Sequence, residues 1–294
     1  MPLLFPMPTD LPLAAEHARI ISQALPFIRD LNGQTIVIKY GGAAQTSPEL
    51  QAAVMGDIAL LHYVGIRPVV VHGGGPEISK MCEKMGIEPR FIDGMRVTDE
   101  ETMRVTEMVL GQIGKNIAAQ LCDKGAPAVG LSGKDGGLLR ALKFEGEHDW
   151  GLVGEVESVD RAVIETLQNG GFVPVVTPVA QGKNGETFNV NADLAAAAIA
   201  REVKASKLLL LTDVAGVYRD FSDKTSLIAQ MTRDEAKDLI ASGAISTGMI
   251  PKITCCLDAV EGGVERAHIV DGRAPHSLLI ELFTDAGCGT MIVS

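Results

Sequence analysis

Hydrophobic and polar positions alternate in blocks along this chain. Short apolar runs are typical of strands buried on both faces, and the longer stretches between them repeat apolar residues about every three or four positions, as helices do. This order predicts an α/β fold, a three-layer sandwich with a mainly parallel open sheet and helices on both faces. The predicted strands cover residues 35–40, 67–72, 128–131, 172–176, 207–212, 267–270 and 290–293. The predicted helices cover residues 13–31, 48–64, 76–86, 98–121, 191–203, 232–241 and 250–262, with a further helix capped by Asp160.

Two segments depart from this alternation. Residues 136–158 and 179–190 carry short alternating runs that predict hairpins, and the second of them separates two halves of the chain. Helix 13–31 precedes the first strand and is not needed for a βα unit, so it either packs on its own body or reaches a neighbouring subunit. The predicted organisation is an N-terminal extension helix (1–32), a first lobe (33–178) and a second lobe (179–294).

Two helix starts have the pattern of a capping box, in which a Thr and a Glu three residues later each bond the other's backbone N–H. They are Thr98 with Glu101, and Thr232 with Glu235. We therefore expect long helices to begin at both places.

The composition narrows the possible partners. The 294 residues are enough for a large core, and with only 4% aromatic residues that core must be aliphatic. A net charge of −11 without a long basic stripe disfavours nucleic acid. No apolar run reaches the roughly 18–20 residues of a membrane span. Acidic small molecules remain possible ligands, because a local site can be positive inside an acidic protein.

The cysteines and the N-terminal segment indicate a cytoplasmic protein. The five cysteines are an odd number with no C-x-x-C spacing, so we interpret them as reduced thiols. The vicinal pair Cys255-Cys256 is compatible with a redox switch, but a buried structural pair is the favoured interpretation. The apolar N-terminal segment is interrupted by prolines and does not begin with basic residues, so a signal peptide is not expected.

Two glycine-rich turns carry the strongest functional signal. Lys39-Tyr40-Gly41-Gly42 closes the first strand, and His72-Gly73-Gly74-Gly75 closes the second. Glycine lets backbone N–H groups approach an anion closely, and a following helix adds its positive end. Two such turns in consecutive βα units are suited to hold one phosphate, with Lys39 beside it. A surface lysine at a strand end is the alternative interpretation of Lys39.

These turns are not standard nucleotide motifs. The P-loop pattern G-x-x-x-x-G-K-[ST] is absent, and the triple glycine lacks the spacing of the dinucleotide fingerprint.

Four later segments add candidate side chains. Arg96, in Gly94-Met95-Arg96-Val97-Thr98, is suited to bind a carboxylate with two parallel hydrogen bonds, although a surface salt bridge beside the helix is the alternative. Asn189 and Asp193 share a face if a helix has begun by then, and Asn191 or Asp193 is also a possible N-cap.

The other candidates lie in the second half of the chain. Thr212 and Asp213 end a core strand at the edge where α/β sites lie. Lys252, in Gly248-Met249-Ile250-Pro251-Lys252, falls at the positive start of a helix, which is unfavourable for a cation unless an anion binds there.

Together these segments resemble the acetylglutamate kinases, a family within the amino-acid kinase superfamily, and the resemblance runs over nearly the whole chain from about residue 13. The matching motifs, in order, are Lys39-Tyr40-Gly41-Gly42, His72-Gly73-Gly74-Gly75, Gly94-Met95-Arg96-Val97-Thr98, Asn189-Val190-Asn191-Ala192-Asp193 and Gly248-Met249-Ile250-Pro251-Lys252.

The resemblance implies that ATP phosphorylates the γ-carboxylate of N-acetyl-L-glutamate, the second step of arginine synthesis. Such a nucleophile is already ionised at neutral pH, which fits the absence of a catalytic triad. Mg²⁺ is expected to bridge the ATP phosphates and to be held mainly by phosphate and water, so no metal-binding residues are assigned.

The resemblance also implies residue roles and lobe functions. The first lobe is expected to bind N-acetylglutamate and to dimerise, and the second to bind ATP. The implied residues are Lys39, Lys252 and Asp193 for catalysis; Gly74, Gly75, Arg96 and Asn189 for the acceptor; and Gly41, Gly42, Thr212, Asp213, Tyr218, Gly248 and Met249 for the nucleotide.

The extension helix and the segment from Gly272 to Gly289 resemble the arginine-inhibited branch of that family. This implies L-arginine as an inhibitor at His268, Glu281 and Gly287, and a hexamer in which N-terminal helices link three dimers. The alternative is that these three residues have only a structural role at the ends of loops. Whether a nitrogen-signalling trimer binds such a hexamer is left open.

One departure and three alternatives remain. Thr247 stands where the family usually has glycine, and we expect a minor effect on that loop. A catalytically inactive sensor is disfavoured by the intact Lys39, Asp193 and Lys252. A dinucleotide-dependent oxidoreductase is disfavoured by the missing fingerprint. A kinase of the same fold with another amino-acid acceptor stays open, because a pocket can be re-sized.

Overall fold

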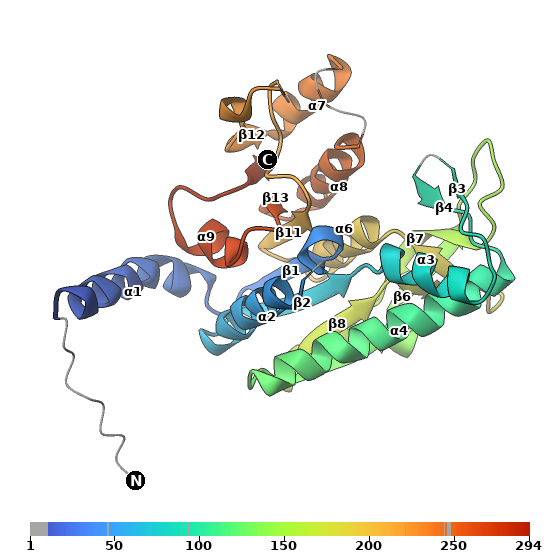
Figure 1. Ribbon diagram of the computed structural model, residues 1–294, viewed down its shortest axis with the longest axis horizontal. Coiled ribbons are helices and arrows are strands. Elements are labelled where there is room, and N and C mark those ends of the chain that lie inside the picture. The colour runs from blue at the N-terminus through green and yellow to red at the C-terminus, as the bar shows by residue number, and fades with distance from the viewer. Residues whose placement is uncertain (1–10, 46, 93, 221, 244, 246–247) are drawn as a thin grey trace, which may run out of the picture.

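The central sheet has eight strands and runs through the whole molecule. The computed structural model describes residues 11–45, 47–92, 94–220, 222–243, 245 and 248–294. The strand order is β12-β14-β13-β11-β1-β2-β8-β5, and every neighbouring pair is parallel except β13 with β14 (Figure 1). The strands are β1 (Thr35–Tyr40), β2 (Arg67–His72), β5 (Ala128–Ser132), β8 (Val173–Thr177), β11 (Lys207–Thr212), β12 (Gln230–Thr232), β13 (Arg266–Asp271) and β14 (Thr290–Val293).

Helices cover both faces of this sheet, so the predicted three-layer sandwich is confirmed. Alternate residues of β1 face opposite layers, with Ile36 and Ile38 in one core and Val37 in the other. The first core also receives α2 (Pro48–Tyr63), α4 (Glu100–Asp123) and α9 (Ser277–Phe283). The second receives α5 (Ala162–Asn169), α6 (Ala192–Glu202), α7 (Arg233–Ala241) and α8 (Ile250–Glu261).

The two predicted hairpins come together as a small barrel. Strand β6 (Leu139–Lys143) pairs antiparallel with β7 (Val153–Val159), and β9 (Val179–Gln181) with β10 (Thr187–Val190). These strands close on one another in the order β10-β7-β6-β9. Strand pairs therefore cross the predicted lobe boundary at residue 178, and the division into lobes stays a prediction.

Some local predictions were wrong. Thr98 does not cap α4; the N-cap is Asp99, whose carboxylate accepts the Thr102 N–H at 2.8 Å. Asn189 and Asp193 do not share a helix face, because α6 begins only at Ala192. Helix α9 was not predicted at all, nor was the two-residue hairpin of β3 (Phe91–Ile92) and β4 (Met95–Arg96). The capping box at Thr232 and Glu235 is confirmed.

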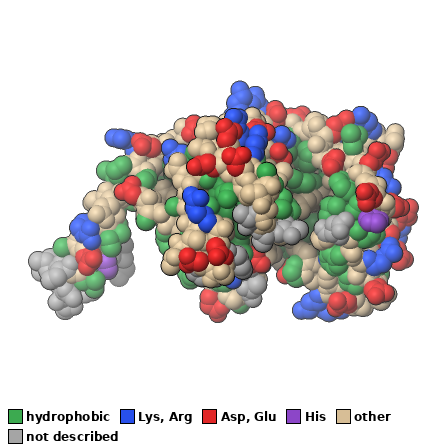
Figure 2. Space-filling view, turned by 90° about the horizontal axis from the view of Figure 1, so that it is seen from above, with side chains coloured by type: hydrophobic (Ala, Val, Ile, Leu, Met, Phe, Trp, Pro, Cys, Tyr) green, Lys and Arg blue, Asp and Glu red, His purple; other side chains and the backbone are tan. Residues whose placement is uncertain are grey.

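The predicted extension helix is present and extends away from the body. Helix α1 (Leu11–Leu31) runs through Pro26, and only its later part approaches α9 (Figure 1). Apolar side chains on it face solvent, with Ile21 70% and Leu25 63% exposed. The space-filling view shows it as an arm standing out from the rest of the protein (Figure 2). No helix among the described residues is long and apolar enough to span a membrane.

A buried carboxylate joins α2 to the start of α9. Asp57 is 1% exposed, and its Oδ1 atom lies 2.7 Å from Nδ1 of His276. His276 adopts a left-handed backbone, with φ of 59°, directly before α9. Burial raises the pKa of the Asp57 carboxyl, and the His276 ring offsets part of that rise.

Candidate active site

The two glycine turns lie side by side at the carboxyl edge of the sheet. Strands β1 and β2 are in register there, and the Gly73 N–H donates to the carbonyl oxygen of Tyr40 at 2.9 Å. A Cβ on Gly41 would lie 3.4 Å from both the Gly73 nitrogen and Nζ of Lys39. A side chain at position 41 would therefore contact both the second turn and Lys39, and glycine leaves that space open.

A neutral histidine supports the second turn. His72 is fully buried at the end of β2, with Nε2 2.9 Å from the Thr177 hydroxyl and Nδ1 3.0 Å from the carbonyl oxygen of Gly73. Burial lowers the pKa of His72 to about 4, although the Gly73 carbonyl favours the charged form. The imidazole therefore positions the turn without adding a charge beside it at neutral pH.

One carboxylate holds both candidate lysines. Oδ1 of Asp193 lies 2.9 Å from Nζ of Lys39, and Oδ2 lies 3.1 Å from Nζ of Lys252. All three side chains are at most 20% exposed. Burial would raise the pKa of Asp193, but the two ammonium groups outweigh it and keep this pKa below its ordinary value. The sequence brought these residues together only through the resemblance, and the structure places them in direct contact.

Two helix starts position this charged cluster. Asn191 is the N-cap of α6 and accepts the N–H groups of Asp193 and Leu194. Asp193 thus lies in the first turn, where the helix dipole favours a carboxylate. Lys252 lies in the first turn of α8, where the dipole disfavours a cation, and the neighbouring Asp193 compensates. The ammonium groups are therefore held ready for an anion.

The predicted acceptor residues line one cavity of about 240 Å³. Gly74 is the N-cap of α3 (Gly75–Lys84), so the positive end of that helix faces the cavity. Arg96 comes from β4 and Asn189 from β10, so the small hairpin and the barrel close two sides of the same space.

The Arg96 side chain is buried, and among the described residues only one of its two terminal nitrogen atoms has hydrogen-bond partners. Its Nη2 atom donates to the carbonyl oxygen of Gly75 at 2.8 Å and to the Ser79 hydroxyl at 2.7 Å, and the guanidinium lies 4.7 Å from the centre of the Phe91 ring. Its Nη1 atom is buried without a hydrogen-bond partner among the described residues. The surface salt bridge considered for Arg96 is therefore wrong, and the unpaired donor suits a carboxylate ligand.

The predicted nucleotide residues are spread along neighbouring element ends. Gly42 starts the short helix η1 (Gly42–Gln45), which contacts β11, and the hydroxyl of Thr212 at the end of β11 donates to Asp213 at 3.1 Å. Met249 is the N-cap of α8. The role of Gly41, Gly42, Thr212, Asp213, Tyr218, Gly248 and Met249 in binding a nucleotide stays a prediction. Thr247 lies outside the described residues.

Sequence reasoning missed a cation at this edge. Arg273 binds Asp271 with two hydrogen bonds of 2.8 and 2.9 Å, and the negative charges of Asp271 and Asp213 help raise its pKa. It follows strand 266–271, whose carboxyl end lies beside Thr212. Its position after a core strand was the signal that could have identified it.

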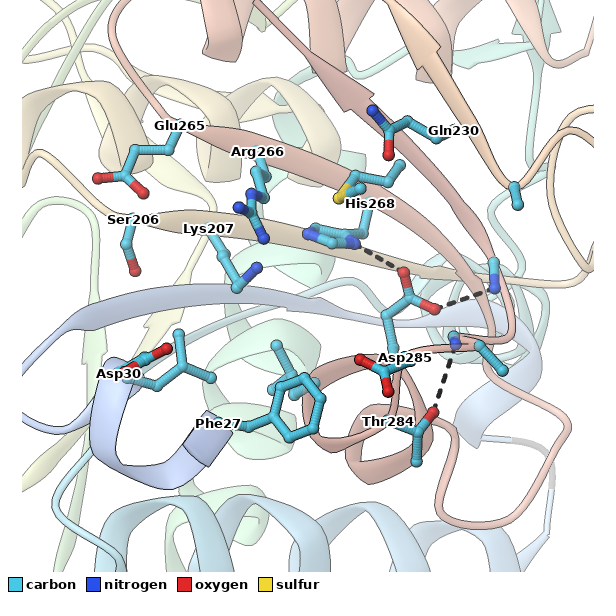
Figure 3. A pocket seen from close by; sticks show the side chains of 18 of the residues that line it. Phe27, Asp30, Ser206, Lys207, Gln230, Glu265, Arg266, His268, Thr284 and Asp285 are labelled. Carbon is cyan, nitrogen blue, oxygen red and sulfur yellow. Dashed lines mark hydrogen bonds and ion pairs between the residues drawn. The ribbon is translucent and has the colours of Figure 1, made fainter. Parts of the chain in front are cut away.

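A second cavity, of about 550 Å³, brings together the three residues predicted for arginine (Figure 3). Glu281 accepts from the backbone N–H groups of Cys288 at 2.7 Å and Gly289 at 3.0 Å, and lies 2.7 Å from Nδ1 of His268. A Cβ on Gly287 would lie 2.9 Å from the Glu281 carboxylate, and its φ of 59° also favours glycine. These contacts give the three residues a structural role as well.

This second cavity is lined by charges of both signs and by the extension helix. Lys207 and Arg266 point into it from β11 and β13, with Phe27 of α1 on the other side (Figure 3). Burial, together with the nearby positive charge of Arg266, lowers the pKa of Lys207 to about 8. Glu265 and Asp285 supply negative charge. The cavity is thus suited to a ligand that carries both an anionic and a cationic group.

Comparison with known proteins assigns this chain to a family. The family model described as "Amino acid kinase family" matches residues 34–271. The acetylglutamate kinase of Symbiobacterium thermophilum is 53% identical over 288 residues, which cover 95% of this chain and 98% of that protein. The acetylglutamate kinase of Caldanaerobacter subterraneus subsp. tengcongensis is 54% identical over 276 residues, 94% of this chain and 92% of that protein.

Solved structures agree with this assignment. N-acetylglutamate synthase from Neisseria gonorrhoeae, complexed with coenzyme A and N-acetyl-glutamate, superposes with a TM-score of 0.83 at 29% identity. The matched region covers 94% of this chain but only 63% of that longer protein. Carbamate kinase from Giardia lamblia, with a TM-score of 0.62 and 17% identity, supports the fold alone.

The buried neutral His72 predicts a pH dependence of stability. The unfolded histidine takes up a proton near pH 6.5, whereas the folded one does so only near pH 4, so acid favours the unfolded state. The contribution of the neutral His72 ring to stability is fully present above pH 6.5 and should be lost as the pH falls to 4. The free energy of unfolding should therefore fall by up to about 3 kcal/mol. Urea unfolding between pH 4 and 7 measures this slope. His72→Gln should flatten it, and His17→Gln, at an exposed position of α1, should leave it unchanged.

Proposed function

This chain belongs to the amino acid kinase family, and we propose that it transfers the γ-phosphoryl group of ATP to the γ-carboxylate of N-acetyl-L-glutamate. The products are N-acetyl-L-glutamyl 5-phosphate and ADP, and the reaction is a step of arginine biosynthesis. The observation that carries the proposal is the arrangement of Lys39, Asp193 and Lys252 beside a cavity with an unpaired Arg96 donor. The identity of about half of all residues to acetylglutamate kinases over nearly the full length supports the same acceptor.

The chemistry requires positioning rather than a general base. A γ-carboxylate oxygen attacks the γ-phosphorus, a new P–O bond forms, and the bond to the leaving oxygen of ADP breaks. The carboxylate is already ionised at neutral pH, so no proton has to be removed. The barrier then depends on bringing two anions together and on neutralising the charge of the transferring group.

The charged cluster supplies that neutralisation. We assign Lys39 and Lys252 to the oxygens of the transferring phosphoryl group, one from the end of β1 and one from the start of α8. Asp193 fixes both ammonium groups, so they need not reorganise when charge moves. Backbone N–H groups of Gly42 and Gly74 are assigned as further donors.

The acceptor is held by its other polar groups. Arg96, with its unpaired Nη1, is assigned to the α-carboxylate, and Asn189, which lines the same cavity, to the same substrate. This places the γ-carboxylate at the glycine turn of residues 73–75, next to the lysines. The cavity volume of about 240 Å³ is compatible with a small amino-acid derivative.

The nucleotide is proposed to enter as its magnesium complex. The carboxylate of the charged cluster, Asp193, is already paired with two ammonium groups. Mg²⁺ is therefore assigned to phosphate oxygens and water, as part of the substrate. We infer a cytoplasmic location for this reaction, since all five cysteines are free thiols.

The first prediction from the proposed function concerns the acceptor. ATP consumption, measured by coupled ADP release with purified protein, should depend on N-acetyl-L-glutamate and should stay near background without it. The positively charged amino group of free L-glutamate lies next to the carboxylate assigned to Arg96, so L-glutamate should be a poor substrate. Activity with free L-glutamate or another acylated amino acid only would contradict the proposed acceptor and favour a re-sized pocket.

The second prediction concerns Lys252. The substitution Lys252→Ala removes one of two charges assigned to the transferring group, so kcat should fall by about 10²–10³. The thermal melting temperature should change little, because Asp193 keeps Lys39 as a partner. Lys183→Ala breaks an exposed ion pair with Glu157 and serves as the matched control, with unchanged kcat. A stable Lys252→Ala variant with a normal rate would rule out this role.

We further propose that the 550 Å³ cavity binds L-arginine as a feedback inhibitor. Glu281 is suited to the guanidinium, and Lys207 and Arg266 are suited to the carboxylate. His268 and Gly287 shape the wall that holds Glu281. The N-acetylglutamate synthase structure solved with L-arginine has a TM-score of 0.79 and 27% identity to this chain, and this chain spans 65% of it.

Helix α1 is proposed to connect subunits. Its exposed apolar side chains, among them Ile20, Ile21 and Leu25, form a surface that is costly to leave in water. A hexamer built as a trimer of dimers would cover these side chains. Because Phe27 and Asp30 of the same helix line the second cavity, assembly and arginine binding would share one element.

The third prediction tests this link. Deletion of residues 1–25 should yield dimers in size-exclusion chromatography with light scattering. The short remnant of α1 is not expected to stay helical, so the arginine concentration for half inhibition should rise at least about tenfold. Activity without arginine should be retained, because the deleted residues lie outside the charged cluster and the acceptor cavity. An unchanged hexamer with unchanged inhibition would refute both assignments to α1.

A further inference from the structure

Thr98 lies between the two acceptor-binding side chains. It is fully buried, and its hydroxyl oxygen lies 3.1 Å from the carbonyl oxygen of Arg96 and 3.2 Å from Nδ2 of Asn189. Arg96 and Asn189 are 93 positions apart in the chain, and both line the 240 Å³ cavity. One hydroxyl therefore connects the segment that carries the guanidinium with the Asn189 side chain of β10.

The number of available donors and acceptors fixes the direction of each hydrogen bond. A threonine hydroxyl has one hydrogen, and the Arg96 carbonyl oxygen can only accept. The hydroxyl hydrogen therefore points to Arg96, and the Thr98 oxygen must accept from Asn189. The opposite orientation of the amide would leave the Thr98 oxygen facing the Arg96 carbonyl as two acceptors. Asn189 is thus held with its NH₂ group on Thr98, and its Oδ1 atom is left for a donor.

The backbone around Thr98 is fixed as well. Its N–H donates to the carbonyl oxygen of Trp150 at 2.9 Å, and its own carbonyl oxygen accepts from Leu152 at 2.6 Å. Leu152 in turn accepts from the Asn189 N–H at 2.9 Å. The hydroxyl and the amide it orients are therefore parts of one rigid frame that joins β4, the loop before β7, and β10.

We propose that Thr98 is a positioning residue that sets the orientation of the Asn189 amide, so that Oδ1 accepts the amide N–H of the acceptor. This inference rests on the proposed function. N-acetyl-L-glutamate with both carboxylates ionised has a single N–H, and an acceptor oxygen in the wall selects for it. If the Asn189 side-chain amide could rotate freely, it would present its NH₂ group to the acceptor about half of the time. That NH₂ group cannot accept the N–H of the acceptor.

Removal of the hydroxyl tests the role. Thr98→Val keeps the shape of the side chain and frees the amide, so KM for N-acetyl-L-glutamate should rise about five- to tenfold, as expected for one oriented hydrogen bond. The value of kcat should stay within about twofold and KM for ATP should not change. Thr98→Ser should restore KM. If the valine variant does not fold, Thr98→Ala removes the same hydroxyl and carries the same measurement.

Thr106 supplies a matched control. It is also fully buried, and its hydroxyl has no hydrogen-bond partner among the residues described. Thr106→Val therefore makes the same change of side chain without freeing the amide, and KM should stay at the value of the unmodified protein.

A double-mutant cycle with Asn189→Ala separates positioning from simple packing. If Thr98 acts through Asn189, Thr98→Val should have no further effect on KM once the amide is gone. An additional five- to tenfold rise in that background would overturn the inference while leaving the proposed function intact. An unmodified protein that does not use N-acetyl-L-glutamate would overturn both.

Discussion

The site depends on one buried carboxylate shared by two ammonium groups. Asp193 connects the end of β1, the start of α6 and the start of α8, three elements far apart in the chain. Without it, two like charges would face each other in a poorly solvated space, at a considerable electrostatic cost. The alanines that follow it in α6 are buried against the sheet and α8, so the small side chains let the carboxylate reach both lysines.

Much of the fold and the centre of the site could be predicted from the sequence. Parallel strands bring their carboxyl ends to the same edge, so Lys39 and the turn at Gly73 had to be neighbours once β1 and β2 were recognised. The same reasoning placed Thr212 there. Local motifs singled out Arg96, Asn189, Asp193 and Lys252 as candidates, and family resemblance assigned them to one site. The comparisons confirm that resemblance for the chain as a whole.

The remaining features of the fold and the site depend on contacts between residues far apart in the chain, which local sequence patterns do not encode. Asp99 caps α4 because Thr98 is already used by contacts with Gly151 and Asn189, more than fifty positions away. The Ser79 contact of Arg96 and the neutral state of His72 both arise from tertiary burial. Helix α9 is only seven residues long, too short for its periodicity to stand out in the sequence.

The bond between Asp57 and His276 has a mechanical consequence. The short helix η1 connects the glycine turn after Lys39 to α2, and α9 carries Glu281 of the second cavity. Since the Asp57 carboxyl is buried, a shift of α9 against α2 would cost the free energy of leaving that group without its His276 partner. The bond therefore favours one position of α9 relative to α2, and with it one position of the Glu281 wall of the second cavity.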